Sequence, residues 1–151
     1  LNEYLTFKLL STQKSSGNIS NLDKLLLQIA SPKFNNSMEI DHIFPTNGLK
    51  ISNQVDRYLN LNHIANLCYL SKINNQIKSN RPPSKYKEYL LAQNEIKLHS
   101  EFMHQTFWDD LILENFNAEI TNKAAFDSYL HIRGQKLIKN IVLRIGGTKN
   151  V

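Results

Sequence analysis

The stretch Met38–Pro45, with the sequence MEIDHIFP, predicts a short β-strand. Apolar and polar side chains alternate over its first six residues, as on a half-buried strand, and the closing proline cannot continue a ladder of hydrogen bonds. A loop is expected from there to about Asn62. The apolar run Leu67–Leu70, LCYL, then predicts a second short strand.

A helix is expected directly after the second strand. Ser71 can cap its N-terminus, and the run Arg81-Pro82-Pro83 ends it after about Asn80. The centre of the chain is therefore predicted to be strand, loop, strand and helix.

Amphipathic patterns predict further helices on both sides of this unit. One of these helices can be capped by Ser20 or Asn21 and stops before Pro32. The others are expected at 2–11, 85–93, 95–107, 108–116 and 121–145. The expected apolar faces are Leu22, Leu25, Leu26 and Ile29 in the second helix, and Leu130, Leu137, Ile141 and Ile145 in the last. The predicted fold class is α+β, mostly α-helical, in a single domain 1–151. Within it, 1–36 is helical support, 37–87 holds the two strands and their helix, and 88–151 is a helical tail.

Composition narrows the classes of protein. The 151 residues carry a formal net charge of +5, a mildly basic balance that agrees with a polyanionic partner without requiring one. A single cysteine, Cys68, excludes a disulfide framework and a structural zinc held by four cysteines or by two cysteines and two histidines. No apolar run is long enough to cross a bilayer and no secretory signal is present, so no membrane partner and a cytoplasmic location are expected. Because the sequence begins with Leu1, we expect the C-terminal fragment of a longer protein.

The adjacent pair Asp41-His42 is the strongest chemical feature. A neutral imidazole can take a proton from water, and a carboxylate offers the hard oxygen that Mg²⁺ or Mn²⁺ prefers. Neighbouring residues on a strand point to opposite faces, so Asp41 can face the following helix while His42 faces a water molecule on the substrate side. Asn75 on that helix is placed to supply a second ligand. The alternative is that the pair forms a solvated turn or a structural hydrogen bond.

The spacing of three asparagines adds a family resemblance. Asn66 precedes Asn75 by nine residues, and Asn80 follows Asn75 by five. With the DHIFP segment, this order resembles the HNH nuclease domain at the C-terminus of GmrSD-type modification-dependent restriction endonucleases. It is also similar to the HNH domain of RNA-guided CRISPR nucleases, although the long helical tail fits that group poorly.

The resemblance implies a ββα-metal (HNH) finger embedded in a helical domain, acting as a metal-dependent DNA endonuclease. His42 would be the general base, and Asp41 and Asn75 would hold one divalent cation, Mg²⁺ or Mn²⁺. Asn66 would keep the histidine oriented by holding the loop between the strands through backbone hydrogen bonds. The implied partners are DNA, including modified phage DNA, and a nucleotide-binding domain N-terminal to this chain, in an antiviral restriction system.

Three positions depart from the family pattern. Ala65 stands where a glycine is usual, Asn75 stands where many HNH enzymes have histidine, and the apolar residue usual near Ser84 is absent. None of these changes removes a catalytic atom. A non-catalytic module of the same shape that only binds DNA or a partner stays open as the alternative.

Several other side chains have two interpretations each. Asn74 competes with Asn75 as the ligand, and His63 is either a loop residue or near the site. Four cations near the helix either contact DNA phosphates or are solvated helix ends: Lys72, Lys78, Arg81 and Lys85. Surface or packing roles are expected for the remaining conspicuous residues: His99, His104 and His131 on helices, Arg133, Lys136 and Arg144 on a solvent face, and Phe107 and Trp108 in the core.

Overall fold

The computed structural model describes residues 19–45, 61–108 and 123–146. Its elements follow the order α2 (Asn21–Ala30), β1 (Glu39–His42), the 3-10 turn η1 (Ile64–Asn66), β2 (Leu67–Leu70), α4 (Lys72–Lys78), α5 (Pro83–Ala92), α6 (Ile96–Gln105) and α7 (Lys123–Gly146). The fold is α+β and mostly helical, which confirms the predicted class. The helices predicted at 2–11 and 108–116, and most of the loop after β1, lie outside the described residues.

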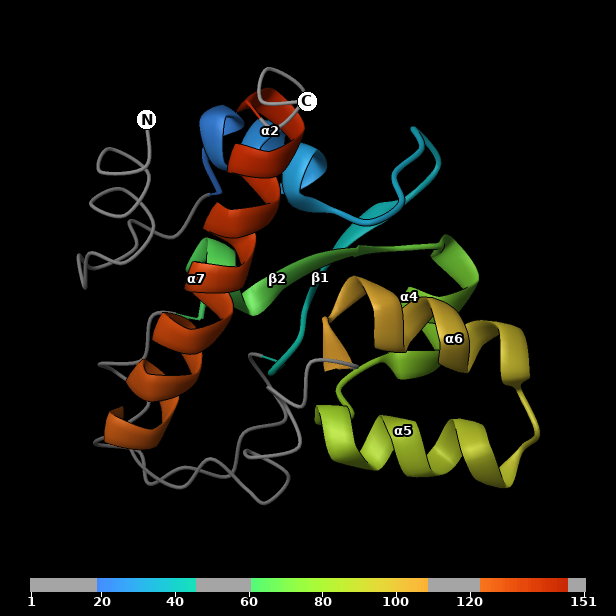
Figure 1. The fold of residues 1–151 in the computed structure, drawn as a ribbon. Coiled ribbons are helices and arrows are strands. Elements are labelled where there is room, and N and C mark those ends of the chain that lie inside the picture. The colour runs from blue at the N-terminus through green and yellow to red at the C-terminus, as the bar shows by residue number, and fades with distance from the viewer. Residues whose placement is uncertain (1–18, 46–60, 109–122, 147–151) are drawn as a thin grey trace.

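The two strands pair antiparallel and form the centre of the molecule. Asp41 lies opposite Cys68 and His42 opposite Leu67. Every residue of β2 is buried, because helices cover it from both sides. In Figure 1, α2 and α7 lie on one side of the strand pair and α4, α5 and α6 on the other. Both strands were predicted correctly.

Helix α2 begins where the capping pattern predicts. The Ser20 side chain accepts a hydrogen bond from the Asp23 backbone N–H at 3.1 Å, which identifies Ser20 and not Asn21 as the cap. The predicted apolar face is wrong in part. Leu22 and Leu25 are 40% and 52% exposed, because α2 turns a neighbouring stripe toward α7 and β2. The buried residues of α2 are Leu26, Leu27 and Ala30.

Helix α4 begins after Ser71, as predicted, but ends at Lys78. The helix stops there because Ser79 adopts a positive φ of 49°, a conformation that cannot continue a right-handed helix. Pro83 then starts α5 two residues before the predicted start, since proline is well suited to the first turn of a helix.

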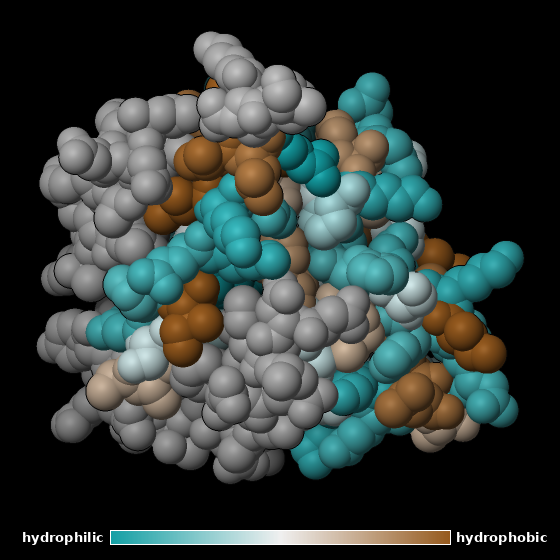
Figure 2. All heavy atoms as spheres, in the orientation of Figure 1, coloured by the Kyte–Doolittle hydropathy of each residue, from teal (hydrophilic) through white to brown (hydrophobic). Residues whose placement is uncertain are grey.

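Helix α7 contributes Leu130, Leu137 and Ile141 to the core, whereas Ile145 near its end is exposed. Phe107 and Trp108 are buried, as predicted. Figure 2 shows hydrophobic side chains on the surface where α2 and the C-terminal end of α7 lie together. Among the described helices, none has both the length and the hydrophobicity that crossing a membrane would need.

Candidate functional site

Asp41 lies on β1 with its carboxylate facing α4. The side chain is buried, and its Oδ2 is 2.9 Å from the Lys78 Nζ. Burial raises the pKa of Asp41, and the Lys78 ammonium opposes that rise. The same ammonium donates a hydrogen bond to the His42 backbone oxygen at 2.8 Å. The predicted metal ligand is therefore already paired with a cation from the chain itself.

This position corrects the expectation for Lys78 as a DNA contact. Its side chain is fully buried between α4 and β1, so its ammonium does not lie on a surface that a DNA backbone can approach. Lys72 and Lys85 are exposed, and Lys85 lies 4.0 Å from Glu88. The half-buried Arg81 stacks its guanidinium over the Tyr89 ring at 4.1 Å.

Asn75 contacts β1 at Glu39, a residue that was not predicted as part of the site. Its Nδ2 donates to the Glu39 Oε1 at 3.2 Å. Glu39 and Asp41 lie two residues apart on β1 and so share the face toward α4. This face brings two carboxylates and one amide together, although each carboxylate contacts a different residue of α4. The strand alternation could have identified Glu39, had it been applied to the residue two before Asp41.

Asn74 is excluded as the alternative ligand. It is fully buried, and its Nδ2 donates to the Glu101 Oε2 at 2.6 Å and to the Leu98 backbone oxygen at 3.0 Å. Its Oδ1 accepts a hydrogen bond from the Tyr86 hydroxyl. These contacts attach α4 to α5 and α6, so Asn74 serves the packing of the helices.

His42 is held by the segment that precedes η1. Its Nε2 lies 2.6 Å from the Asn62 Oδ1, and its ring is half-buried. An amide oxygen only accepts hydrogen bonds, so Nε2 carries the proton of the neutral ring and Nδ1 carries the lone pair. His63 has a local role, since its Nδ1 accepts from the Ala65 N–H at 3.0 Å and caps η1. Asn62 was not predicted from the sequence, because nothing in the pattern separates it from other loop asparagines.

Asn66 joins the two ends of the segment between the strands. Its Oδ1 accepts from the Phe44 N–H at 2.9 Å, and its Nδ2 donates to the Phe44 and Leu61 backbone oxygens at 3.0 and 2.9 Å. The Tyr129 hydroxyl of α7 donates to the same Oδ1 at 3.3 Å. Asn66 is fully buried. If one of these hydrogen bonds is lost, water cannot replace it, and the polar group is left unpaired. The backbone two residues after His42 is fixed in this way.

Arg133 of α7 supports the same turn and corrects the expected solvent face. Its side chain is fully buried, its Nη1 donates to the Ala65 backbone oxygen at 2.8 Å, and its Nη2 donates to the Gln105 backbone oxygen at 3.3 Å. Burial lowers the pKa of Arg133. Ala65 itself has no left-handed backbone, since the positive φ values of described non-glycine residues occur elsewhere. The usual glycine is thus not required at this position.

No known protein family, curated protein or solved structure matches this chain.

The face of β1 toward α4 has suitable donors for a hard divalent cation. Among the described residues, no three His, Cys, Asp or Glu side chains form a metal-binding group. Glu39, Asp41 and Asn75 nevertheless offer carboxylate and amide oxygens, the donors that Mg²⁺ prefers, and Mg²⁺ usually keeps several waters. The ammonium of Lys78 beside Asp41 acts as a stand-in cation, which shows that this carboxylate is placed to hold positive charge. The donor types on this face are therefore those that such an ion uses, while Asp41 is paired with Lys78.

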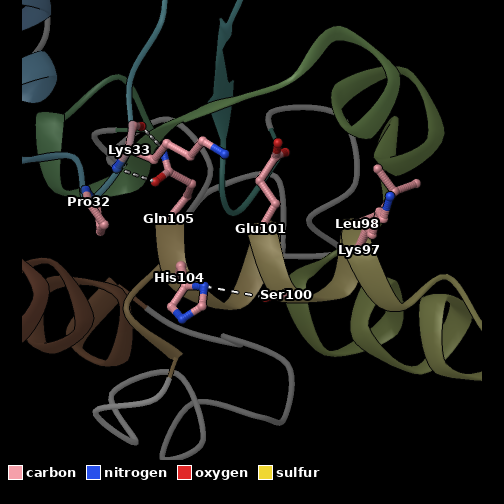
Figure 3. Close-up of a pocket in the computed structure, with 8 residues that line it drawn as sticks. All are labelled: Pro32, Lys33, Lys97, Leu98, Ser100, Glu101, His104 and Gln105. Carbon is pink, nitrogen blue, oxygen red and sulfur yellow. Dashed lines mark hydrogen bonds between the residues drawn. The ribbon is translucent and has the colours of Figure 1, made fainter.

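A separate pocket lies between α6 and the segment after α2. Figure 3 shows the side chains that line it, among them Lys33, Lys97, Glu101 and His104. None of the residues predicted for catalysis, metal binding or DNA binding lines this pocket. The remaining histidines lie on helices, with His99 half-buried and His131 exposed.

Proposed function

We propose that this chain is a metal-dependent endonuclease of the HNH kind that hydrolyses phosphodiester bonds of DNA. The observation that supports it most is the orientation of His42. Asn62 holds Nε2, and no hydrogen bond to Nδ1 is found among the described residues, so its lone pair can accept a proton. Asp41, with its carboxylate, is the residue next to His42 in the sequence. The DHIFP motif and the asparagine spacing add the family resemblance.

The chemistry assigned to His42 is general base catalysis. Nδ1 takes a proton from a water molecule, the water oxygen attacks phosphorus, and the bond from phosphorus to the 3′ oxygen breaks. The products are a 5′-phosphate and a 3′-hydroxyl, which gains its proton from solvent. Asn66 and Asn62 keep the imidazole in place during this transfer by fixing the backbone and the ring, respectively.

Asp41 and Asn75, with Glu39 beside them, are the residues that would hold the cation. When bound, a divalent ion there supplies stabilisation of the negative charge that builds on the phosphate and on the departing oxygen. Glu39 and Asp41 each contact a residue of α4, Asn75 and Lys78 respectively.

DNA is the proposed substrate because of charge and resemblance. The chain carries a net charge of +5, and two exposed lysines lie near Asn75 in the sequence, Lys72 at the start of α4 and Lys85 in α5. Such cations contact phosphates without reading the sequence. By resemblance alone, we extend the proposal to an antiviral restriction system in which an N-terminal nucleotide-binding domain recognises modified DNA.

The test compares the parent with His42→Ala and with the control His131→Ala, which removes an exposed histidine from α7. Nicking of supercoiled plasmid is measured with Mg²⁺ and with Mn²⁺, after circular dichroism has verified folding. We expect His42→Ala to lose about 10²-fold or more of the rate, as for a positioned base, and His131→Ala to keep the parental rate. Equal rates for the parent and His42→Ala would refute the assignment.

A non-catalytic DNA-binding module is the second candidate. The ion pair between Lys78 and Asp41 favours it, since it gives the carboxylate a partner without any metal. A parent protein that binds DNA but neither nicks plasmid nor binds Mn²⁺ would support this candidate over the nuclease.

A further inference from the structure

We propose that Lys78 is a built-in competitor for the divalent cation at Asp41, so that a metal ion binds only when the ammonium withdraws. This inference rests on the proposed function, because it concerns the affinity of the same site for its cation. It gives Lys78 a role in controlling the site instead of the DNA contact expected from the sequence.

The position of the ammonium supports the competition. The Lys78 Nζ lies 2.9 Å from the Asp41 Oδ2 and 2.8 Å from the His42 backbone oxygen, and the side chain is fully buried. Mg²⁺ binds a carboxylate oxygen at about 2.0–2.1 Å. An ion at that oxygen would have the ammonium as an immediate neighbour, and like charges at such a distance repel strongly where water is excluded.

Helix α4 carries the proposed ligand Asn75 and the competing Lys78 on one face. Asn75 and Lys78 are three residues apart on α4, so their side chains lie next to each other toward β1. The first contacts the carboxylate of Glu39 and the second that of Asp41. The ammonium thus lies beside the amide that we propose as a metal ligand.

Lysine is also able to withdraw. Its four-carbon stem is flexible and its ammonium is a compact point charge, in contrast to the rigid fork of arginine. Lys78 is the last residue of α4, and the chain turns at Ser79 directly after it. Withdrawal of the ammonium would then need rotation of the side-chain bonds of Lys78 at the C-terminal end of α4.

The test measures Mn²⁺ affinity in the absence of DNA, with electron paramagnetic resonance reporting the free ion. It compares the parent with Lys78→Met, which keeps the length of the side chain, and with Lys72→Met, which removes an exposed lysine from the same helix. We expect Lys78→Met to bind Mn²⁺ about tenfold more tightly or better, because a like charge has been removed beside the ion. Lys72→Met should stay within about twofold of the parent, because exposed charges are screened. Unchanged or weaker binding by a folded Lys78→Met would overturn the competition.

A measurement on the parent covers the case in which Lys78→Met does not fold. Reductive methylation followed by mass spectrometry reports how accessible each lysine is. We expect Mn²⁺ to accelerate the modification of Lys78 relative to Lys72, and Mn²⁺ binding without such a change would overturn the inference. If the parent binds Mn²⁺ but neither measurement shows competition, the inference fails and the nuclease proposal stands. If neither protein binds Mn²⁺, the metal site fails, and the competition with it.

Discussion

Replacing Asn66 with alanine tests whether this amide holds the segment between the strands. The substitution removes the four hydrogen bonds that the side chain makes with described residues, and it leaves the Phe44 N–H and the Phe44 and Leu61 carbonyl groups without that partner. Each such bond contributes about 1 kcal/mol net, and a buried group left unpaired costs about 1–3 kcal/mol. We therefore expect a loss of about 3–5 kcal/mol, a large share of the roughly 5–15 kcal/mol by which domains are stable.

The matched comparison is Tyr129→Phe, which removes the hydroxyl that donates the 3.3 Å bond to the same amide and keeps the ring. We expect it to cost about 0.5–1.5 kcal/mol, the usual range for one hydrogen bond. Urea unfolding followed by circular dichroism and by the fluorescence of Trp108, the single tryptophan, measures both. The role of Asn66 in holding this segment would be refuted if Asn66→Ala lowered the free energy of unfolding by less than about 1 kcal/mol. It would also be refuted if Tyr129→Phe lowered it by more than Asn66→Ala does.

Two further predictions concern buried groups. Burial raises the pKa of Cys68 to about 12. We therefore expect its thiol to react with Ellman's reagent at pH 8 far more slowly than a free cysteine in the folded protein, and at the ordinary rate in urea. Fast labelling of the folded protein would contradict the burial of this thiol. Arg133→Lys should destabilise the fold by about 1.5–3 kcal/mol, because an ammonium cannot reach both the Ala65 and Gln105 carbonyls that the guanidinium joins. The control Arg144→Lys, at an exposed position of α7, should change stability by less than about 0.5 kcal/mol in the same urea experiment, and equal effects would contradict the special role of Arg133.

The short elements could be predicted because their signals are local. The alternation before Pro45 and the apolar run Leu67–Leu70 identify the strands, and Ser71 marks the start of α4. The same alternation correctly placed Asp41 toward the helix that follows β2.

The partners of individual side chains could not be predicted, because they depend on which elements pack together. Lys78 and Arg133 look like ordinary surface cations in the sequence, yet neighbouring elements bury both. The structural contacts of Asn74 depend on the packing of α6, which supplies Glu101. The contact of His42 with Asn62 likewise depends on how the segment before η1 is folded.

The contacts of α7 with η1 have a consequence for assembly. Tyr129 and Arg133 brace a turn more than sixty residues earlier in the chain. A growing polypeptide on the ribosome can form both strands and α4 before this brace exists, so the histidine would be locked in place only after synthesis of the last helix. The same arrangement suits a split protein, in which a separate peptide that carries α7 would supply the missing hydrogen bonds to the turn.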